Sequence, residues 1–397
     1  MLVQQYVDML GGKSVIRTLS EFATARGKEI GYENVFDYSL GNPSVAVPQA
    51  FTDTCIRLLQ TESPMALHGY SQSLGIPEVR AKLADSLNKR FGMDYTGDHI
   101  FMTSAAAGAL AHAFRLVTVP GDEIITFAPF FPEYMPYVNL TGALLKVVPP
   151  NTEDFQINFE AFEKMIGEKT MAVLVNSPNN PSGIVYSTAT IQRLAEILKQ
   201  KSKELGHEIY IISDEPYREI TFAGVDAPYI SKYYDNTLSC YSYSKSLSLP
   251  GERIGYLAIN PACADSKTMV QMCGQISRGI GHNCPPSLMQ LAIAENLELT
   301  ADLSVYETNM NLIYDCLMEL GFTCVKPGGT FYIFPKALEE DAKIFCEKAM
   351  KYDLVLVPAD SFGCPGYFRM AYCIETEKVK RSLVALRKFV ETEYPQR

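Results

Sequence analysis

Ile209-Tyr210-Ile211-Ile212-Ser213-Asp214-Glu215-Pro216-Tyr217 joins an apolar run to a cluster of polar side chains. The run 209–212 has the length and the isoleucine content of a buried β-strand. An aspartate that leaves a buried strand is partly desolvated, so Asp214 needs a cation as partner. The order Asp-Glu-Pro also suits a helix start with Asp214 as its N-cap. The stretch alone leaves both interpretations open.

Short apolar runs and helical patterns alternate through the middle of the chain. The runs lie at 101–102, 123–127, 144–148 and 171–175, and a helical pattern covers 188–203. Strands that alternate with helices favour a sheet whose strands are mostly parallel. We therefore predict an α/β fold with a mostly parallel sheet that helices cover on both faces.

After about residue 290 the pattern changes to that of a smaller α+β domain. Long helical patterns there flank short apolar runs at 331–334, 354–357 and 367–373. We predict three parts: an N-terminal segment that packs on the small domain, a large domain and a small C-terminal domain. Their boundaries are 1–44, 45–290 and 291–397.

Composition places the chain among ordinary globular proteins. It has 397 residues, of which 47% are hydrophobic and 20% are charged, and a net charge of −10. A negative chain is not drawn to nucleic acid or to an anionic membrane, so any bound anion needs a local pocket. The N-terminus lacks the pattern of a signal peptide, and no apolar run is long enough for a membrane span. We expect a cytoplasmic protein.

Metal and nucleotide motifs are absent from the sequence. The ten cysteines form no Cys-x-x-Cys pair, and the five histidines have no ligand spacing, so we expect no metal site. Gly12-Lys13-Ser14 resembles the end of a phosphate loop, but Val7 stands where that motif requires glycine.

Three further polar clusters follow or border predicted strands. They are Thr103 to Gly108, Asn176 to Gly183, and Ser242 to Arg253. Backbone N–H groups at a helix start suit a phosphate, and a lysine near another cation becomes a nucleophile toward carbonyls. Each cluster alone also fits a plain structural role, such as a tight turn or a solvated lysine.

Taken together and in order, these clusters resemble fold type I pyridoxal-phosphate (PLP) enzymes, specifically the class I/II aminotransferases related to aspartate aminotransferase. The resemblance runs from about Leu40 to Arg369. It rests on Gly41-Asn42-Pro43, HGYSQSLGIPEVR, TSAAAGAL, APFFPEY, NSPNNPSG, SDEPY, SYSKSLSLPGERIGY and FRMAY.

The resemblance implies catalytic roles for Lys245, Asp214 and Tyr217. Lys245 matches the lysine that holds PLP as a Schiff base and later moves the substrate proton. Asp214 matches the residue that ion-pairs with the pyridine nitrogen. Tyr217 and Asn180 match hydrogen-bond donors to the phenolic oxygen of the ring, and Asn180 also borders the substrate.

The remaining implied contacts hold the phosphate, the ring and the substrate. Phosphate contacts fall to Arg253, Ser242, Ser244 and the backbone N–H groups of Ala105 and Ala106. Phe131 matches the aromatic residue that stacks on the ring, and Tyr70 matches a tyrosine that reaches the phosphate from the neighbouring subunit. Arg369 matches the arginine that binds the substrate α-carboxylate, and Gly41 lets the backbone approach it.

The resemblance also implies the reaction and the assembly. We expect a PLP-dependent transferase of amino acid metabolism and biosynthesis that exchanges the amino group between an L-amino acid and a 2-oxo acid by a ping-pong mechanism. The shared contact of Tyr70 implies a homodimer with shared active sites. A carbon–sulfur β-lyase or an amino-acid decarboxylase on the same fold remains an alternative.

The sequence differs from the family pattern at two places, and one further residue, Arg278, has no assigned role. The phosphate turn has Ala105-Ala106-Ala107 where the family usually has glycine, and alanine restricts the backbone. Phe131 stands in place of a more usual tyrosine or tryptophan. Arg278 lies in a stretch that in some aspartate enzymes carries the arginine for the substrate side chain, but its local spacing differs, so the amino donor stays open.

Overall fold

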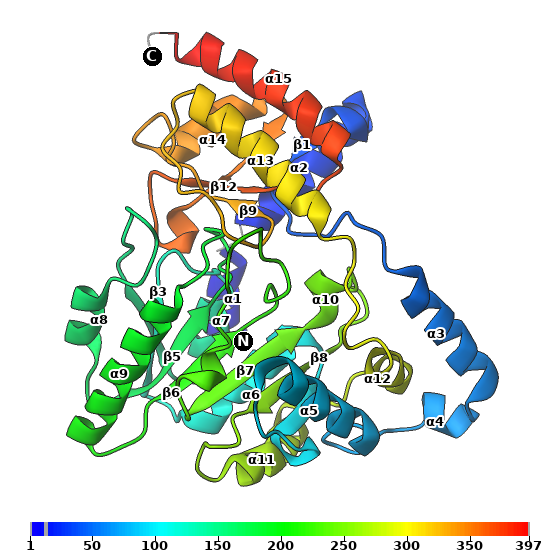
Figure 1. The fold of residues 1–397 in the computed structure, drawn as a ribbon. Helices are drawn as coiled ribbons and strands as arrows, with labels where there is room; N and C mark the ends of the chain where they lie inside the picture. Colours follow the sequence, from blue (N-terminus) through cyan, green and yellow to red (C-terminus); the bar gives the residue numbers. More distant parts are fainter. Residues whose placement is uncertain (1, 12–14, 396–397) are drawn as a thin grey trace. The chain divides into compact units, whose positions relative to one another are not determined.

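A computed structural model describes residues 2–11 and 15–395, so the Gly12-Lys13-Ser14 stretch lies outside the described residues. The chain forms two compact units (Figure 1). The small unit holds Met1–Ser44, Pro181–Gly183 and Ser304–Arg397, and the large unit holds Val45–Asn180 and Ile184–Leu303.

The large unit is built on a seven-stranded sheet in the order β2-β8-β7-β6-β5-β3-β4. Its strands are β2 (Ile100–Thr103), β3 (Glu123–Phe127), β4 (Leu144–Val148), β5 (Thr170–Asn176), β6 (Tyr210–Asp214), β7 (Thr237–Ser242) and β8 (Gly255–Ile259). The ladders from β4 to β7 are parallel, while β8 pairs antiparallel with both β2 and β7. This confirms the predicted α/β class with a mostly parallel sheet.

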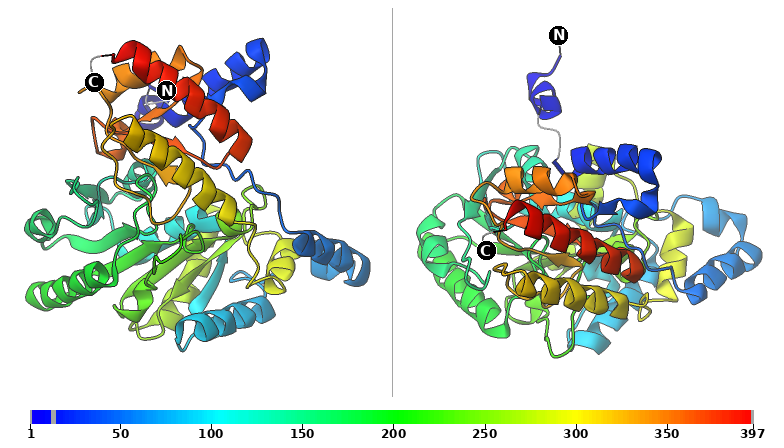
Figure 2. Two further views of the ribbon diagram at one scale, coloured as in Figure 1. Left: turned by 45° about the horizontal axis from the view of Figure 1, so that its top comes forward. Right: turned by 90° about the horizontal axis from the view of Figure 1, so that it is seen from above.

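Helices of the large unit cover both faces of this sheet, as Figure 2 shows. They are α3 (Gln49–Thr61), α4 (Pro64–His68), α5 (Pro77–Phe91), α6 (Ala105–Val117), α7 (Tyr134–Asn139), α8 (Phe159–Met165), α9 (Thr188–Leu205), α10 (Tyr243–Ser246), α11 (Ser266–Ile280) and α12 (Ser287–Ala294).

Alternation along the strands sends successive side chains to opposite faces. In β6, Ile212 packs in the core with α6 and α11, whereas its neighbour Ile211 packs with α8 and α9. In β7, Cys240 joins the α6 side, and Tyr241 joins a core under α5 and α12. Both faces of these strands are therefore buried, which explains the apolar run at 209–212, although β7 also buries Thr237, Ser239 and Ser242.

The large unit extends beyond residue 290, where the sequence pattern places the domain boundary. Met289, Ala292 and Ile293 of α12 share a core with residues of α3 and α5. These contacts keep α12 and the chain up to Leu303 in the large unit.

The small unit combines two short sheets with helices. Its strands are β1 (Phe36–Asp37), β9 (Tyr332–Ile333), β10 (Leu354–Val355), β11 (Val357–Pro358) and β12 (Phe368–Ala371). Its helices are α1 (Gln4–Gly11), α2 (Val15–Ile30), α13 (Ser304–Glu319), α14 (Ala342–Met350) and α15 (Thr376–Glu393). The single run expected at 354–357 forms two strands, because β10 pairs parallel with β1 while β11 pairs antiparallel with β12.

The N-terminal segment is part of the small unit. Besides the β1–β10 ladder, Ala23 and Val35 share a buried core with Val355. Residues at opposite ends of the chain thus complete one structure, which positions the segment around Gly41.

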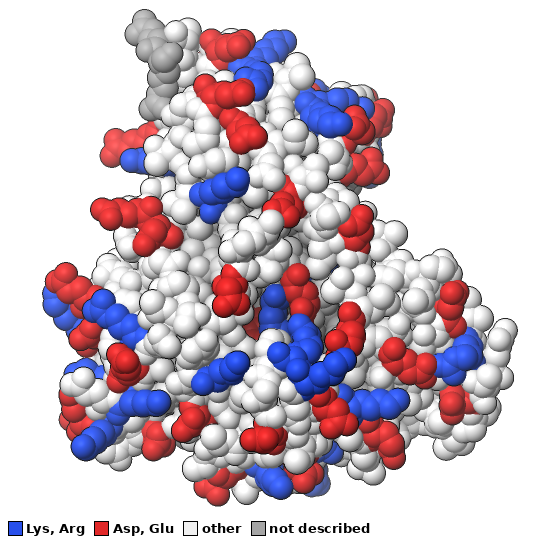
Figure 3. Space-filling model, in the orientation of Figure 1, with Lys and Arg blue, Asp and Glu red and all other residues white. Residues whose placement is uncertain are grey.

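Acidic and basic side chains are interspersed over the face of the molecule that Figure 3 draws. In the part of the chain that the structure describes, no helix has the length and apolar character needed to cross a membrane.

Candidate active site

Asp214 lies at the carboxyl end of β6, in register with Asn176 on β5 and with Cys240 on β7. Ligands of open α/β sheets bind at this edge, because loops from neighbouring parallel strands meet there. Asp214 is a strand end and not a helix N-cap, so the N-cap interpretation is wrong. Its side chain is only 5% exposed.

The Asp214 carboxylate has one defined hydrogen bond. Tyr134 Oη donates to Oδ2 over 2.5 Å, and no hydrogen-bond partner of the buried Oδ1 lies among the described residues. Burial raises the pKa of Asp214 to about 7; the Tyr134 hydrogen bond lowers it, and the nearby charge of Glu215 raises it. A buried acid of this kind is ready to accept a cation, which would restore its charge.

Tyr134 keeps its proton at neutral pH. Burial and the neighbouring Asp214 raise the pKa of Tyr134 well above its usual value. Its hydroxyl therefore acts as a fixed donor that holds the carboxylate in one orientation. The ring of Phe131 packs edge-on against Tyr134, with centroids 5.6 Å apart.

Asn176 connects two predicted site residues across the sheet edge. Its Nδ2 donates to the backbone carbonyl of Asp214 over 2.8 Å, and its Oδ1 accepts from the backbone N–H of Asn180 over 2.7 Å. Both contacts are buried, so the turn that carries Asn180 has a fixed distance from the end of β6. The sequence reasoning placed Asn176 in this turn but did not identify its bridging role.

Lys245 lies on α10, a short helix that directly follows β7. Ser242 caps this helix by accepting a hydrogen bond from the backbone N–H of Ser244 over 3.1 Å, and its hydroxyl donates to Ser244 Oγ over 2.7 Å. The two serines predicted to bind phosphate therefore also fix the turn that carries Lys245. Because β6 and β7 are neighbours, Asp214 and Lys245 follow adjacent strands at one edge.

The start of α6 contains an unusual backbone conformation. Ala105, its first residue, has φ of 63°, a left-handed value that costs a non-glycine residue on the order of 1 kcal/mol. Its backbone lies against Gly255 of β8, where an added Cβ would be 2.9 Å from Ala105 Cα. The first N–H groups of a helix have no acceptor within it, so this turn, which includes the N–H of Ala106, has donors that suit an anion.

Tyr217 and Arg253 follow β6 and α10, respectively. Tyr217 is buried, and its proximity to Tyr134 raises the pKa of that residue. Arg253 is exposed, has φ of 52° and donates from Nη1 to the carbonyl of Pro250 over 3.0 Å. Burial raises the pKa of Tyr137, as do the charges of Glu133 and Asp214, while Arg253 lowers it, so Asp214 and Arg253 both lie near this residue.

In the small unit, Arg369 and Gly41 lie around Tyr332. Arg369 is buried on β12, and its Nη2 donates to the carbonyl of Ser39 over 2.5 Å. The guanidinium lies over the rings of Tyr332 and Phe362, at 4.7 and 5.0 Å from their centroids. Gly41 accommodates the Tyr332 hydroxyl, because a Cβ there would lie 1.9 Å from Tyr332 Oη.

Tyr70 and Arg278 both lie on the surface of the chain. Tyr70 follows α4 with its side chain fully exposed, and Arg278 is an exposed residue of the last turn of α11. No group of three or more histidine, cysteine or acidic side chains with the geometry of a metal site occurs among the described residues.

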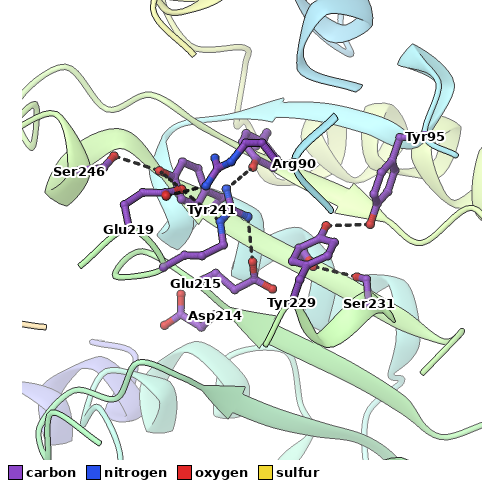
Figure 4. Close-up of polar contacts among 12 residues, drawn as sticks. Arg90, Tyr95, Asp214, Glu215, Glu219, Tyr229, Ser231, Tyr241 and Ser246 are labelled. Atoms are coloured by element: carbon purple, nitrogen blue, oxygen red, sulfur yellow. Dashed lines mark hydrogen bonds and ion pairs between the residues drawn. The ribbon is translucent and has the colours of Figure 1, made fainter. Parts of the chain in front are cut away.

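The sequence reasoning missed Tyr134 and the buried charges next to Asp214. Tyr134 lies 80 positions from Asp214, and only the β3-to-α7 connection brings it to the end of β6. Glu215 and Arg218 form a buried ion pair of 3.0 Å. Figure 4 shows Glu215 beside Asp214. In the sequence, the available signal for these buried charges was an arginine among three acidic residues within the six positions 214–219.

Comparison with known proteins identifies the class. The sequence model of the family described as aminotransferase class I and II matches residues 33–386. An aspartate aminotransferase from Thermotoga maritima is 30% identical over 366 residues, which cover 91% of this chain and 92% of that protein. One from Bacillus subtilis is 29% identical over 391 residues, which cover 93% and 95%.

The structural comparison gives the same result. The crystal structure of an aminotransferase from Eubacterium rectale has 46% sequence identity and a TM-score of 0.96, and the match covers 99% of this chain and all of that one. The chain therefore belongs to the class I and II aminotransferase family and is an aminotransferase similar to the aspartate aminotransferases. This confirms the family and the activity predicted from the sequence; enzymes of this family depend on PLP.

Because its pKa is raised, Asp214 should destabilise the folded protein without PLP by an amount that depends on pH. Between about pH 4 and about pH 7 the folded protein keeps a proton that the unfolded chain, with a pKa near 3.8, releases. The free energy of unfolding contributed by Asp214 therefore falls as pH rises through this window. Asp214→Asn removes the titration and should stabilise the PLP-free protein above pH 7, by up to about 4 kcal/mol.

Urea unfolding of the two PLP-free proteins at a series of pH values measures this difference. The advantage of the variant should shrink as the pH falls toward 4. Asp226→Asn, at an exposed loop position, controls for the loss of one surface charge. A difference between wild type and Asp214→Asn that does not change with pH contradicts the account.

Proposed function

We propose that this aminotransferase uses PLP to exchange the amino group between an L-amino acid and a 2-oxo acid by a ping-pong mechanism. The observation that carries the proposal is the buried Asp214 carboxylate, whose Oδ1 has no hydrogen-bond partner among the described residues. The protonated pyridine nitrogen of PLP supplies the cation that this oxygen requires, so the residues present fit the cofactor.

PLP, when bound, supplies an electron sink for the bond to the substrate Cα. Asp214 holds the proton on the pyridine nitrogen, and the Tyr134 hydrogen bond keeps the carboxylate facing it. Asn180 and Tyr217 donate hydrogen bonds to the phenolic oxygen. Lys245 would hold the cofactor through its Nζ, and the same amine would be the base that takes the proton from the substrate Cα.

We assign the phosphate contacts to the start of α6 and to the turn after β7. The backbone N–H groups of Ala105 and Ala106 point out of the first turn of α6 and favour an anion there. Ser242 and Ser244 add hydroxyl donors from the end of β7, and Arg253 adds a cation from the segment just before β8. Phe131 stacks on the cofactor ring; its contact with Tyr134 supports this assignment.

We assign the substrate α-carboxylate to Arg369. Its guanidinium is buried and oriented by the Ser39 carbonyl and by two aromatic rings, so it is held in one orientation before substrate arrives. A planar fork binds a carboxylate through two parallel hydrogen bonds. The backbone at Gly41 approaches the same group, which the absence of a side chain permits.

We further propose that the enzyme is a homodimer in which Tyr70 reaches the phosphate of the neighbouring subunit. The support is exposed apolar side chains on the two helices that precede Tyr70: Ile56 and Leu59 of α3 and Met65 of α4 are exposed in the single chain, as is the Tyr70 ring. Such apolar groups on adjacent helices are typical of a protein interface. The cytoplasmic location stays a prediction that cell fractionation tests.

The first experiment separates transamination from the lyase and decarboxylase alternatives. An amino donor alone should convert the visible absorption of bound PLP and release one oxo acid per site, and a 2-oxo acid should reverse the change. A donor panel of aspartate, aromatic and small neutral amino acids against 2-oxoglutarate and pyruvate begins with aspartate, because the relatives are named as aspartate aminotransferases.

Lys245→Ala should lower turnover by at least about 10³-fold, because nucleophile and base are lost together. Lys267→Ala on the surface controls for the loss of a lysine. Borohydride should fix PLP to Lys245 in the wild type. Release of ammonia and pyruvate or of carbon dioxide without an acceptor, in place of reversible exchange, contradicts transamination.

Arg369→Lys should weaken amino acid binding, because lysine keeps the charge but loses the fork. We expect kcat/KM to fall roughly 10- to 100-fold, the loss of about one charged hydrogen bond, with most of the change in KM. Arg387→Lys, which alters an exposed ion pair, is the matched control. An unchanged substrate dependence removes Arg369 from the site.

Mixed subunits test the shared site. The Lys245→Ala and Tyr70→Ala variants should each be weakly active alone. A dimer of one subunit of each kind should regain activity, because one of its two sites combines an intact Lys245 with an intact Tyr70 from the other subunit. Lys245→Ala mixed with Asp214→Asn should not, because every site of that hybrid keeps one defect. A monomer in sedimentation, or equal activities of the two mixtures, contradicts the assignment.

A further inference from the structure

A group of charged side chains lies next to Asp214, where Figure 4 labels Glu215, Glu219 and Arg90. At its centre Arg218 donates from Nη1 to Glu215 Oε2 over 3.0 Å and from Nε to Glu219 Oε1 over 3.2 Å. The side chains of Arg218 and Glu215 are 8% and 4% exposed. We call Arg218 with Glu215, Glu219 and Arg90 the Arg218 cluster.

Aromatic side chains enclose the cluster. Arg218 Nη2 donates to Tyr256 Oη over 3.0 Å, and its guanidinium lies 4.1 Å from the centre of the Tyr241 ring. Phe91 and Tyr229 lie farther away, at 5.2 and 5.8 Å from the same group. All three donor nitrogens of Arg218 are thus engaged, and the cation is shielded from water.

A second cation completes the charge balance. Arg90 on α5 pairs with Glu219 Oε2 over 2.6 Å. The cluster therefore holds two arginines against two glutamates, while Asp214 lies beside it with its own charge uncompensated in the chain. Glu215, adjacent to Asp214, is the negative charge that acts on it most directly.

The cluster is continuous with both segments that we assign to the cofactor. Glu215 follows Asp214 in the chain, and Arg218 follows Tyr217. On the other side, Tyr241 Oη donates to Glu219 Oε1 over 3.3 Å and lies 2.9 Å from Ser246 Oγ. Ser246 is the neighbour of Lys245, so polar contacts run from the end of β6 to the helix that carries the lysine.

Stability alone is a poor explanation for such a cluster. Replacing a buried ion pair with apolar groups of similar volume is often neutral or stabilising, because both charges lose their hydration. A large apolar core already surrounds this position, formed by residues of α5, β7 and β8. The location of the charges next to Asp214 and Lys245 calls for a role in the site.

We propose that Arg218 is a positioning residue for transamination: it holds the Asp214–Tyr217 turn against the Lys245 turn and cancels the charge of Glu215 beside Asp214. The inference rests on the proposed function, because it assumes that Asp214 and Lys245 contact PLP. Arg218 itself acts through its neighbours and contacts neither substrate nor cofactor in this account.

The charge part of the proposal predicts opposite effects for two substitutions. Arg218→Met leaves Glu215 without its cation, so the negative potential at Asp214 and at the cofactor increases. Glu215→Gln leaves Arg218 in excess at that position and makes the potential more positive. The double variant Glu215→Gln/Arg218→Met removes both charges and returns the potential toward that of the wild type.

The visible absorption of PLP bound to Lys245 reports this potential, because the linking nitrogen takes up a proton more readily in a negative field. In the purified holoenzyme, the pH midpoint of the band should rise by about one unit in Arg218→Met and fall in Glu215→Gln. The double variant should lie between them. Arg218→Lys, which keeps the charge, should stay closer to the wild type than Arg218→Met.

Kinetics and a matched control complete the test. Arg218→Met should lower kcat at least tenfold with a smaller change in the KM of the amino donor, since Arg369 is untouched. Arg193→Met is the control, because Arg193 also pairs with a glutamate and covers an aromatic ring, but on the exposed face of α9. Its midpoint should not move.

The outcomes separate this inference from the proposed function. Midpoints that stay fixed, or that move in the same direction in Arg218→Met and Glu215→Gln, overturn the role of Arg218 while wild-type PLP binding and exchange stand. If Arg218→Met does not fold, Glu215→Gln and Arg218→Lys decide, since the first must lower the midpoint and the second must nearly preserve it. A wild type that binds no PLP overturns the proposed function instead.

Discussion

The structure of the candidate site depends on one constraint, a carboxylate that is buried before its cation arrives. Asp214 ends a central strand, and the surrounding core removes water from it. Tyr134 satisfies one oxygen and fixes its direction, which leaves the other for a partner from outside the chain. The buried acid is unfavourable in the free protein. In the proposed function, a bound pyridinium would pair with it, so that this unfavourable burial favours cofactor binding.

The neighbouring features serve this arrangement. Asn176 ties the backbone of Asp214 to that of Asn180, and Ser242 caps the short helix that carries Lys245. These contacts are short, buried and local to the sheet edge, so they place side chains from three separate segments with little freedom. A site preorganised in this way loses little entropy when cofactor binds.

Much of the fold was predictable because local pattern and long-range structure agree. The run 123–127 coincides with β3, whose last four residues are buried. The run 144–148 coincides with the edge strand β4, of which only Val148 is fully buried, so its hydrophobic residues gave the signal without full burial. β8 was not predicted as a strand; all five of its residues are buried, so the short stretch Gly-Tyr-Leu-Ala-Ile shows no alternation. The split of 354–357 into β10 and β11 depends on partners far along the chain, which local reasoning cannot identify.

The site was predictable to a similar extent, and for a related reason. Residues that carry chemistry, such as Lys245 and Asp214, lie in motifs and can be matched one by one, although their roles stay predictions. Tyr134 and Arg218 act through contacts to other side chains, and a tyrosine or arginine has many ordinary uses. Their roles become visible only in the three-dimensional structure, where α7 packs against the end of β6 and the Arg218 cluster lies beneath α5. The alanine at position 105 likewise looks unfavourable in the sequence, yet the structure accommodates its left-handed backbone beside Gly255.

The central claim is that Asp214 keeps the ring nitrogen of the cofactor protonated. Nitrogen NMR of enzyme loaded with PLP that carries ¹⁵N in the ring measures this protonation directly. The account predicts a protonated ring nitrogen in the wild type at about pH 8, and a deprotonated one in Asp214→Asn that still binds the cofactor. A deprotonated ring nitrogen in the wild-type enzyme would contradict it.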